Sequence, residues 1–438
     1  MNARLVTLVF LLPLALRGHD SPEHTPPAPY AEALAHAPRP LPDRVVLTWS
    51  GDPATTQTVT WRTDTTTTHA VGEISRANES GRDLKGTRVE AQSTAFQSDL
   101  GTANYHHVEF TELVPDTLYT YRVGDGVNWS EWFHFRTASR EPRRFSFLYF
   151  GDAQNDLKTH WSRVFREAFR AAPRAAFTLH AGDLVNRGIR DAEWGEWFGS
   201  PAWVNGTIPV VPAIGNHEYY VPAEGQPRRA TAHWTVQFTL PDHGPAGLEE
   251  TCYFFDYQGA RIVVLNSNEK HAEQAAWLRT VLAREPQRWT ILAFHHPVFS
   301  PARERSNTPV SELWKPIIDE FKIDLVLTGH DHTYARTGEV GTRNVPTGFQ
   351  QAYDPAIGTV YVVSVSGPKM YELKGPVDWA VSSAANTQLF QVITIDGDEL
   401  HYEARTPTNR LHDAFTLRKR LGQPNQLVEQ PVTPLPTR

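Results

Sequence analysis

Cysteine is almost absent from this chain, because Cys252 is the only one among 438 residues. No disulfide can form within the chain, and a zinc site built from cysteines is excluded. Cys252 lies in a strand-like run with the aromatic residues that follow it, so we expect a buried, unreactive thiol.

An excess of positive charge is also lacking. The formal net charge is −7, which argues against a nucleic-acid-binding protein that depends on bulk electrostatics. The charged fraction of 21% and the hydrophobic fraction of 40% are normal for a folded protein. A chain of this length is expected to form two domains, and no nucleic-acid partner is predicted.

Long hydrophobic runs are missing after the first residues. The mostly apolar run from Leu5 to Leu16 follows Arg4 and ends before Arg17. This run is short for a membrane span but suits the core of a signal peptide, the alternative being a buried N-terminal helix. We therefore predict a signal peptide over 1–18 and an exported protein, periplasmic or secreted, without stable membrane insertion.

Composition then divides the chain. Residues 19–40 are rich in Pro, Ala and His and are predicted as a linker. Short strands broken by turn residues fill 41–138, with alternation such as that over 56–62, and no convincing helix intervenes. This pattern favours an all-β sandwich, and the run 113–123 resembles the tyrosine-corner region of fibronectin type III domains. The Pro- and Gln-rich residues 421–438 are predicted as a disordered tail.

From Phe145 onward the pattern changes to buried apolar strands that alternate with amphipathic helices. Strands are expected at 145–150, 176–179, 208–214, 262–265, 291–294 and 325–327, and helices at 161–172, 275–282 and 313–321. Two later strands, 389–395 and 400–404, flank a hairpin turn. Residues 143–420 are therefore predicted to form an α/β domain.

Five of these strands are followed at once by Asp, Asn or His. The sequences that follow them are Gly151-Asp152, Gly182-Asp183, Gly215-Asn216-His217-Glu218, His295-His296-Pro297 and Gly329-His330-Asp331-His332. Polar residues gather at the carboxyl ends of strands in such sheets, and these side chains suit zinc, manganese or iron. Each Asp or Asn alone could be a helix N-cap, but five such strand ends together favour a metal site.

The ordered set of motifs resembles that of the calcineurin-like metallophosphoesterases. Together with the preceding sandwich, it is similar to bacterial relatives of the purple acid phosphatases. The resemblance implies a four-layer α/β domain, a β-sandwich flanked by helices, and two divalent metal ions (Fe, Zn or Mn). It assigns Asp152 and His332 to the first ion, Asp183 to both, and Asn216, His295 and His330 to the second. His217 would contact the phosphate or protonate the leaving oxygen.

Two departures from the family pattern bear on the chemistry. The tyrosine that binds ferric iron in purple acid phosphatases is replaced by Asn186, which predicts divalent ions and a colourless protein. Asn186 is a candidate weak ligand or contact to the bridging water. The extra histidines of the plant enzymes are also missing after His296. Arg303 and Arg305 lie in that loop and, with His296, are candidate phosphate contacts, although solvated loop charges are the commoner role of such arginines.

The leading hypothesis is hydrolysis of phosphate monoesters of small molecules by a metal-bridged hydroxide, with Asp183 and His217 as the catalytic residues. One alternative is a phosphodiesterase that acts on small or lipid-like substrates. Another is a non-catalytic binding protein at the cell surface, against which the intact ligand set argues. The sequence leaves the substrate, the metal pair and the oligomeric state open.

Overall fold

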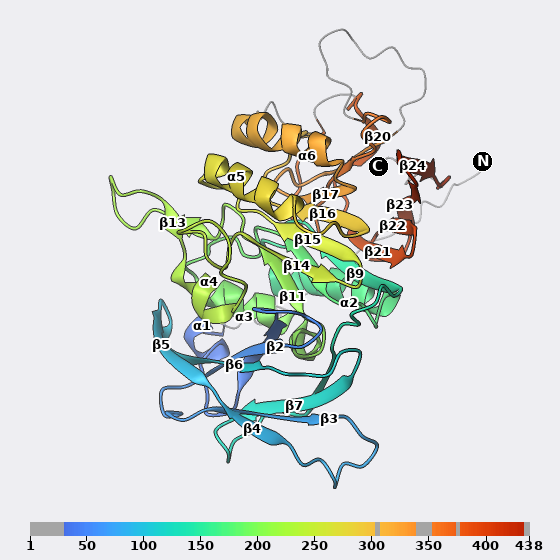
Figure 1. Ribbon diagram of the computed structural model, residues 1–438. Helices are drawn as coiled ribbons and strands as arrows, with labels where there is room; N and C mark the ends of the chain where they lie inside the picture. Colours follow the sequence, from blue (N-terminus) through green and yellow to red (C-terminus); the bar gives the residue numbers. More distant parts are fainter. Residues whose placement is uncertain (1–29, 303–306, 339–352, 374–376, 433–438) are drawn as a thin grey trace, which may run out of the picture.

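The computed structural model describes residues 30–302, 307–338, 353–373 and 377–432. Figure 1 shows an N-terminal sandwich, coloured blue to cyan, beneath a larger domain that carries all the helices from α2 onward. The predicted signal peptide, Arg303 and Arg305 lie outside the described residues. Within these ranges, no helix combines the length and apolar composition needed to cross a membrane.

The N-terminal domain is a sandwich of two four-stranded antiparallel sheets. Val114 N donates a hydrogen bond to Tyr119 Oη at 2.9 Å, which is the contact expected of a tyrosine corner. One sheet consists of β1 (Asp43–Thr48), β2 (Gln57–Thr63), β6 (Gly101–Phe110) and β5 (Gln92–Ser98). The other consists of β4 (Thr87–Glu90), β3 (Val71–Arg76), β7 (Leu118–Gly124) and β8 (Phe133–Arg136).

The larger domain contains two seven-stranded mixed sheets. The first consists of β11 (Val210–Ala213), β10 (Thr178–Ala181), β9 (Phe145–Phe150), β21 (Phe390–Asp396), β22 (Glu399–Arg405), β23 (Leu411–Arg420) and β24 (Gln423–Glu429). The second consists of β14 (Tyr253–Tyr257), β15 (Ala260–Val264), β16 (Trp289–Ala293), β17 (Leu325–Thr328), β19 (Val360–Val363), β18 (Tyr334–Thr337) and β20 (Ala380–Ala384). A small ribbon pairs β12 (Tyr219–Tyr220) with β13 (Arg229–Ala230). Strands β9 to β11 are parallel, as are β15 to β17, so each group ends at one edge of its sheet.

Helices α2 (Ser162–Ala171), α5 (His271–Leu282) and α6 (Lys315–Phe321) cover the outer faces of the two sheets. Helices α3 (Asp191–Gly199) and α4 (Ala232–Gln237) lie beside the N-terminal sandwich, and η1 (Leu157–Trp161), η2 (Ala202–Gly206) and η3 (Val310–Trp314) are short helical segments. Along β15, Ile262 belongs to the core shared with the first sheet, whereas Val263 packs with Leu278 and Ile317 of the helices. This alternation confirms the predicted four-layer α/β fold, in which two sheets face each other between helices.

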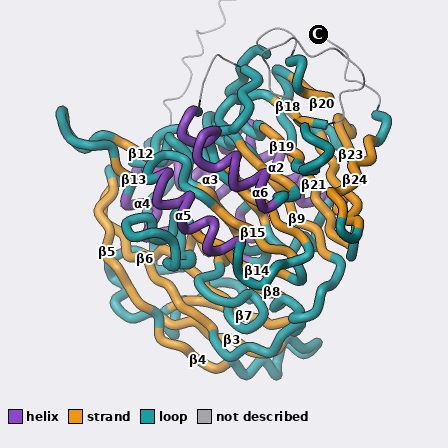
Figure 2. The backbone as a smooth tube through the Cα atoms, turned by 45° about the horizontal axis from the view of Figure 1, so that its top comes forward, coloured by secondary structure: helices purple, strands orange, loops and turns teal. Residues whose placement is uncertain are grey.

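Both chain segments expected to lack structure contain ordered elements. Helix α1 (Glu32–Ala35) lies within the predicted linker, and Glu32 pairs with Arg190 at 2.5 Å. The prediction of a disordered tail is wrong for 423–429, because these residues form strand β24, which pairs with β23. Figure 2 shows this pair at the edge of the molecule. Leu427 is buried and Glu429 pairs with Arg336 at 2.7 Å, so apolar burial and an ion pair hold this strand.

The sandwich is attached to the larger domain through apolar and charged contacts. Trp49, which follows β1, packs against Phe177, Phe255 and Tyr257 with ring centroids 5.2–6.0 Å away. Arg44 of β1 reaches Asp191 at the first position of α3, with Nη1 and Oδ1 2.7 Å apart. The sandwich therefore supports the segment that leads into α3.

Candidate metal centre

The predicted ligands meet at the edge where the carboxyl ends of both sheets come together. Asp152, Asp183 and Asn216 follow β9, β10 and β11, whereas His295 follows β16 and His330 and His332 follow β17. Four of these residues have a left-handed backbone, with φ of 23° at Asp152, 51° at Asp183, 74° at His330 and 46° at His332. Such conformations are strained for residues other than glycine and cluster at functional sites.

Asp152, Asp183 and His332 form the first group of ligands. One ligand atom of each lies within 4.8 Å of the others, and all three side chains are buried. His332 Nδ1 donates to Lys369 O at 2.8 Å, so Nε2 carries a lone pair, and this atom lies 3.5 Å from Asp152 Oδ1. Asp152 Oδ1 is itself buried without a hydrogen-bond partner among the described residues. Because two acceptors face each other in a buried place, this group fits a cation.

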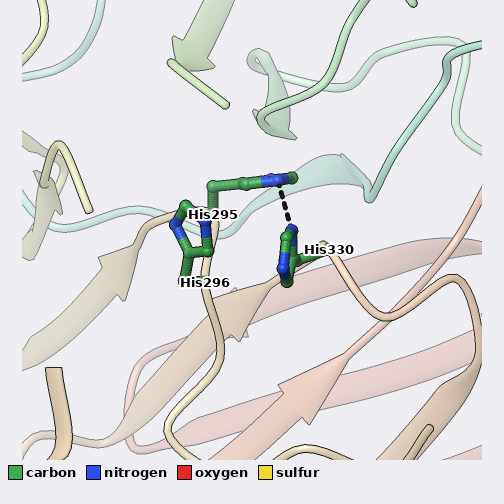
Figure 3. Close-up of side chains that lie close together, drawn as sticks. All are labelled: His295, His296 and His330. Atoms are coloured by element: carbon green, nitrogen blue, oxygen red, sulfur yellow. Dashed lines mark hydrogen bonds between the residues drawn. The ribbon is translucent and has the colours of Figure 1, made fainter. Parts of the chain in front are cut away.

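His295, His296 and His330 form the second group, whose ring nitrogens also lie within 4.8 Å of one another. Figure 3 shows their rings converging, with His330 Nδ1 3.1 Å from His295 Nε2. Asn216 Oδ1 lies 3.0 Å from the same nitrogen, which adds an amide oxygen. His295 Nδ1 donates to Ala181 O at 2.9 Å, which directs Nε2 into the group.

Asp183 connects the two groups. Its Oδ2 lies 3.2 Å from His295 Nε2, and its Oδ1 accepts a hydrogen bond from His217 N at 2.8 Å. Burial opposes the charge on His295, but the Asp183 carboxylate prevails and raises the pKa of His295 to about 9. The proton on His295 thus occupies a place between two ligands that a metal ion would take.

His217 lies at the open side of this cluster. Its Nδ1 donates to the backbone oxygen of Asn186 at 2.5 Å, and its Nε2 lies 3.8 Å from Asp183 Oδ2. The side chain is 26% exposed, whereas that of Asp183 is only 1% exposed. His217 therefore presents Nε2 toward a place that solvent, and a substrate, can reach.

His296 was expected to contact the substrate. The structure places it within the second group, and its Nδ1 lies 2.8 Å from Ser267 Oγ. Burial lowers the pKa of His296 to about 3, so its ring is neutral. His296 is half-buried and lies next to the ligands.

Two residues that support the site were missed by sequence reasoning. Glu218 is fully buried and accepts hydrogen bonds from Gly215 N at 2.8 Å, Asp183 N at 3.0 Å and Val185 N at 3.3 Å. It therefore ties the turns after β10 and β11 together, and its place beside His217 in the motif was the available signal. Gln154, two residues after Asp152, contacts Asp183 Oδ2 through Nε2 at 2.8 Å.

Two facing sheets that carry a cluster of metal-binding side chains at their strand ends, preceded by a β-sandwich, are the arrangement of a metallophosphoesterase. Residues 145–334 match the calcineurin-like phosphoesterase family, and residues 42–137 match the N-terminal domain of purple acid phosphatases. The chain therefore combines a calcineurin-like phosphoesterase domain with the N-terminal domain of the purple acid phosphatases.

Two curated proteins and one solved structure are similar to this chain. The chain is 26% identical to an uncharacterized protein of Mycobacterium tuberculosis over 72% of this chain and 66% of that protein. It is 25% identical to purple acid phosphatase 15 of Arabidopsis thaliana, over 61% of this chain and 55% of that protein. The chain thus spans less than two thirds of the length of these curated relatives. The solved structure of purple acid phosphatase PPD1 from yellow lupin has the same fold, with a TM-score of 0.71 at 19% identity over 87% of this chain and 75% of the lupin chain.

Proposed function

We propose that this protein hydrolyses phosphate monoesters with two divalent metal ions. The observation that carries this proposal is the position of Asp183, which belongs to the first group of ligands while its Oδ2 lies 3.2 Å from His295 Nε2 of the second. A carboxylate in this position can be shared by two ions. Paired ions are suited to phosphoryl transfer, because charge develops on both the attacking and the leaving oxygen.

The chain's own residues divide between the two ions. Asp152, Asp183 and His332 would hold the first, and Asp183 would share the second with Asn216, His295 and His330. The ions, iron, zinc or manganese, supply Lewis-acid activation of the phosphoryl group and of the attacking water when bound. Since the ligands are two carboxylates, an amide and imidazoles, divalent ions suit the site better than ferric iron.

His217 is the proposed acid for the leaving oxygen. Because Nδ1 donates to Asn186 O, the ring is fixed with Nε2 toward the site. A proton on Nε2 can pass to the leaving alkoxide, and the 26% exposure of the side chain allows the ring to recover it from solvent. His296, Arg303 and Arg305 are the proposed contacts to the phosphate, and the protein is proposed to act after export.

Metal content and colour provide the first test. The purified chain is expected to hold two ions, to lack a visible charge-transfer band and to hydrolyse a nitrophenyl phosphate monoester. Asp183→Asn should lose bound metal and turnover, whereas Asp242→Asn, an exposed control, should retain both. A purple protein would contradict the divalent assignment, and bound metal without turnover on any phosphoester would favour a binding protein.

The choice of substrate and the role of His217 need separate assays. The monoester should be hydrolysed faster than the bis-nitrophenyl ester, and the reverse order would favour a phosphodiesterase. His217→Ala should lower kcat about a hundredfold, a typical loss for general acid catalysis, with less effect for a substrate whose leaving group needs no proton. His69→Gln in the exposed part of the sandwich is the matched control.

A further inference from the structure

Arg228 lies beside the second group of ligands, on the ribbon that β12 and β13 form, and the proposed mechanism does not use it. Figure 1 shows this ribbon at the left of the larger domain. We propose that Arg228 forms a subsite for a second anionic group, a carboxylate or another phosphate, on the alcohol part of the substrate. The inference rests on the proposed phosphatase function and names the class of phosphate monoester that the site would favour.

The first observation is where Arg228 is attached. Its Nη2 donates to the backbone oxygen of Asn216, in the peptide that joins the ligand Asn216 to His217. The N–H of the same peptide donates to Asp183 Oδ1 at 2.8 Å. Because the C=O and N–H of a trans peptide point in opposite directions, Asp183 and Arg228 lie on opposite sides of this peptide. Arg228 is therefore one peptide outside the ligand cluster, next to the residue proposed to face the leaving oxygen.

The second observation is how the guanidinium group is held. Arg228 Cζ lies 5.3 Å from the centroid of the Tyr219 ring. Tyr219 is itself fixed, because its hydroxyl donates to Glu269 Oε1 at 2.5 Å and accepts from Asn266 Nδ2 at 2.7 Å. A guanidinium that rests on a ring and is tied to a carbonyl oxygen loses little further freedom when it binds an anion.

The third observation is that this guanidinium has donors to spare. Arg228 is exposed, and within the described part of the chain it forms no ion pair and no hydrogen bond other than that to Asn216 O. A guanidinium carries five N–H donors, so most of them stay available. Two parallel N–H groups match the two oxygens of a carboxylate or a phosphate. The group is thus suited to bind an anion that enters from solvent.

The charge of Arg228 also reaches the second group of ligands. Burial is the main cause that lowers the pKa of His296 to about 3, and the positive charge of Arg228 acts in the same direction. A cation so close to the site attracts anions locally, although the whole chain carries a net charge of −7. The ions would hold the ester phosphate, and a peptide separates Arg228 from them. The partner of Arg228 is therefore a second anion on the leaving-group side, whose binding adds to that of the phosphate.

Three alkyl phosphates of equal chain length test the subsite. One ends in a methyl group, one in a carboxylate and one in a phosphonate, which the enzyme cannot release as phosphate. Phosphate release by the metal-loaded full chain gives kcat and KM for each. We expect kcat/KM of wild type to be about tenfold higher for the two substrates with a second anion, the size of effect of one charge-assisted hydrogen bond.

Arg228→Gln should remove this preference, mainly by raising KM for the carboxylate and phosphonate substrates about tenfold. Arg228→Lys keeps the charge and loses the fork, so it should retain part of the preference. Arg229→Gln is the matched control, because Arg229 is exposed on the same ribbon but donates to Tyr220 Oη at 2.9 and 3.2 Å. This control should keep the preference within about twofold.

A merely structural role of Arg228 gives a different result. If the side chain only held the Asn216 peptide, Arg228→Gln would lower kcat for all three substrates by the same factor and would release metal from the second site. Counting the bound metal by mass spectrometry detects this loss. The subsite predicts that Arg228→Gln keeps two ions per chain.

The outcomes distinguish this inference from the proposed function. If wild type hydrolyses the three substrates with kcat/KM equal within about twofold, the subsite is overturned and the phosphatase stands. An equal loss on all three substrates in Arg228→Gln, or a preference lost in Arg229→Gln alone, would overturn the subsite too. A wild-type chain that holds metal and turns over none of the three would refute the proposed function, and the inference with it.

Discussion

Replacing Arg44 should weaken the attachment of the N-terminal sandwich to the larger domain. Arg44 Nη1 and Nη2 lie 2.7 and 2.8 Å from the two carboxylate oxygens of Asp191, and Nη2 also donates to the backbone oxygen of Asp191 at 3.1 Å. Both side chains are at most 4% exposed. Arg44→Met would keep most of the apolar stem and leave a buried carboxylate with fewer partners.

The expected cost can be worked from the remaining contacts. Breaking a buried ion pair by removing one partner costs about 3–5 kcal/mol. Arg62 Nη1 stays 3.3 Å from Asp191 Oδ2, so we expect the lower end, about 3 kcal/mol. Asp191→Asn leaves Arg44 without its charged partner and should cost a similar amount. In the double variant neither charge is left alone, so its cost should fall about 1–3 kcal/mol short of the sum of the two single costs.

Calorimetric and urea unfolding of the full chain and the three variants would measure this coupling. Burial raises the pKa of Asp191, but His233, Arg44 and Arg62 together lower it below its ordinary value. A lowered carboxyl pKa contributes stability that is present above the unfolded pKa and is lost as the pH falls below it. The interaction energy between Arg44 and Asp191 should therefore decrease at acidic pH. If the cost of the double variant at neutral pH equals the sum of the two single costs within about 0.5 kcal/mol, Arg44 and Asp191 are not coupled and the reasoning is refuted.

Two further predictions concern the sandwich. The imidazole ring of His106 lies between Thr63 Oγ1 and Ser93 Oγ, each 2.7 Å from one ring nitrogen. Burial lowers the pKa of His106 from 6.5 to about 4. The stability that the neutral ring contributes is fully present above pH 6.5. As the pH falls from 6.5 to 4, the free energy of unfolding should decrease by up to about 3 kcal/mol. His106→Gln should flatten this part of the stability–pH curve, and an unchanged slope would contradict the assignment. Arg122 lies over Trp129 and Trp132, 4.1 and 4.6 Å from their ring centroids, so Arg122→Ala should lower the free energy of unfolding by about 1–3 kcal/mol. Urea unfolding would check this value, and a change within about 0.5 kcal/mol would show that the stacking contributes little.

The six metal ligands could be predicted from the sequence because each follows a buried strand. Parallel strands such as β9 and β10 are almost entirely buried, and each is followed by a glycine and then by the ligand, as at Gly151 and Gly182. The resemblance to a known family supplied the division between two ions. The structure brings the six predicted ligands together.

The residues that sequence reasoning missed depend on contacts between distant segments. Glu218 is defined by backbone N–H groups up to 35 residues away, and Gln154 by its contact with His332, 178 residues along the chain. Strand β5 (Gln92–Ser98) has no fully buried residue and β24 begins with Gln-Pro-Asn-Gln, so neither shows an apolar pattern. Pairing with β6 and β23 creates these strands, and pairing partners are not visible in local composition.

The left-handed backbone at Asp152, Asp183, His330 and His332 has a consequence for evolution and engineering. Each such residue costs on the order of 1 kcal/mol that a glycine at the same position would not. Substitution by glycine would relieve the strain and at the same time delete a ligand. The positions where this chain can most readily gain stability are therefore among those where it can least change without losing its metal centre. Selection for thermal tolerance alone would erode the site, and a degenerate descendant would be expected to be more stable than its active parent.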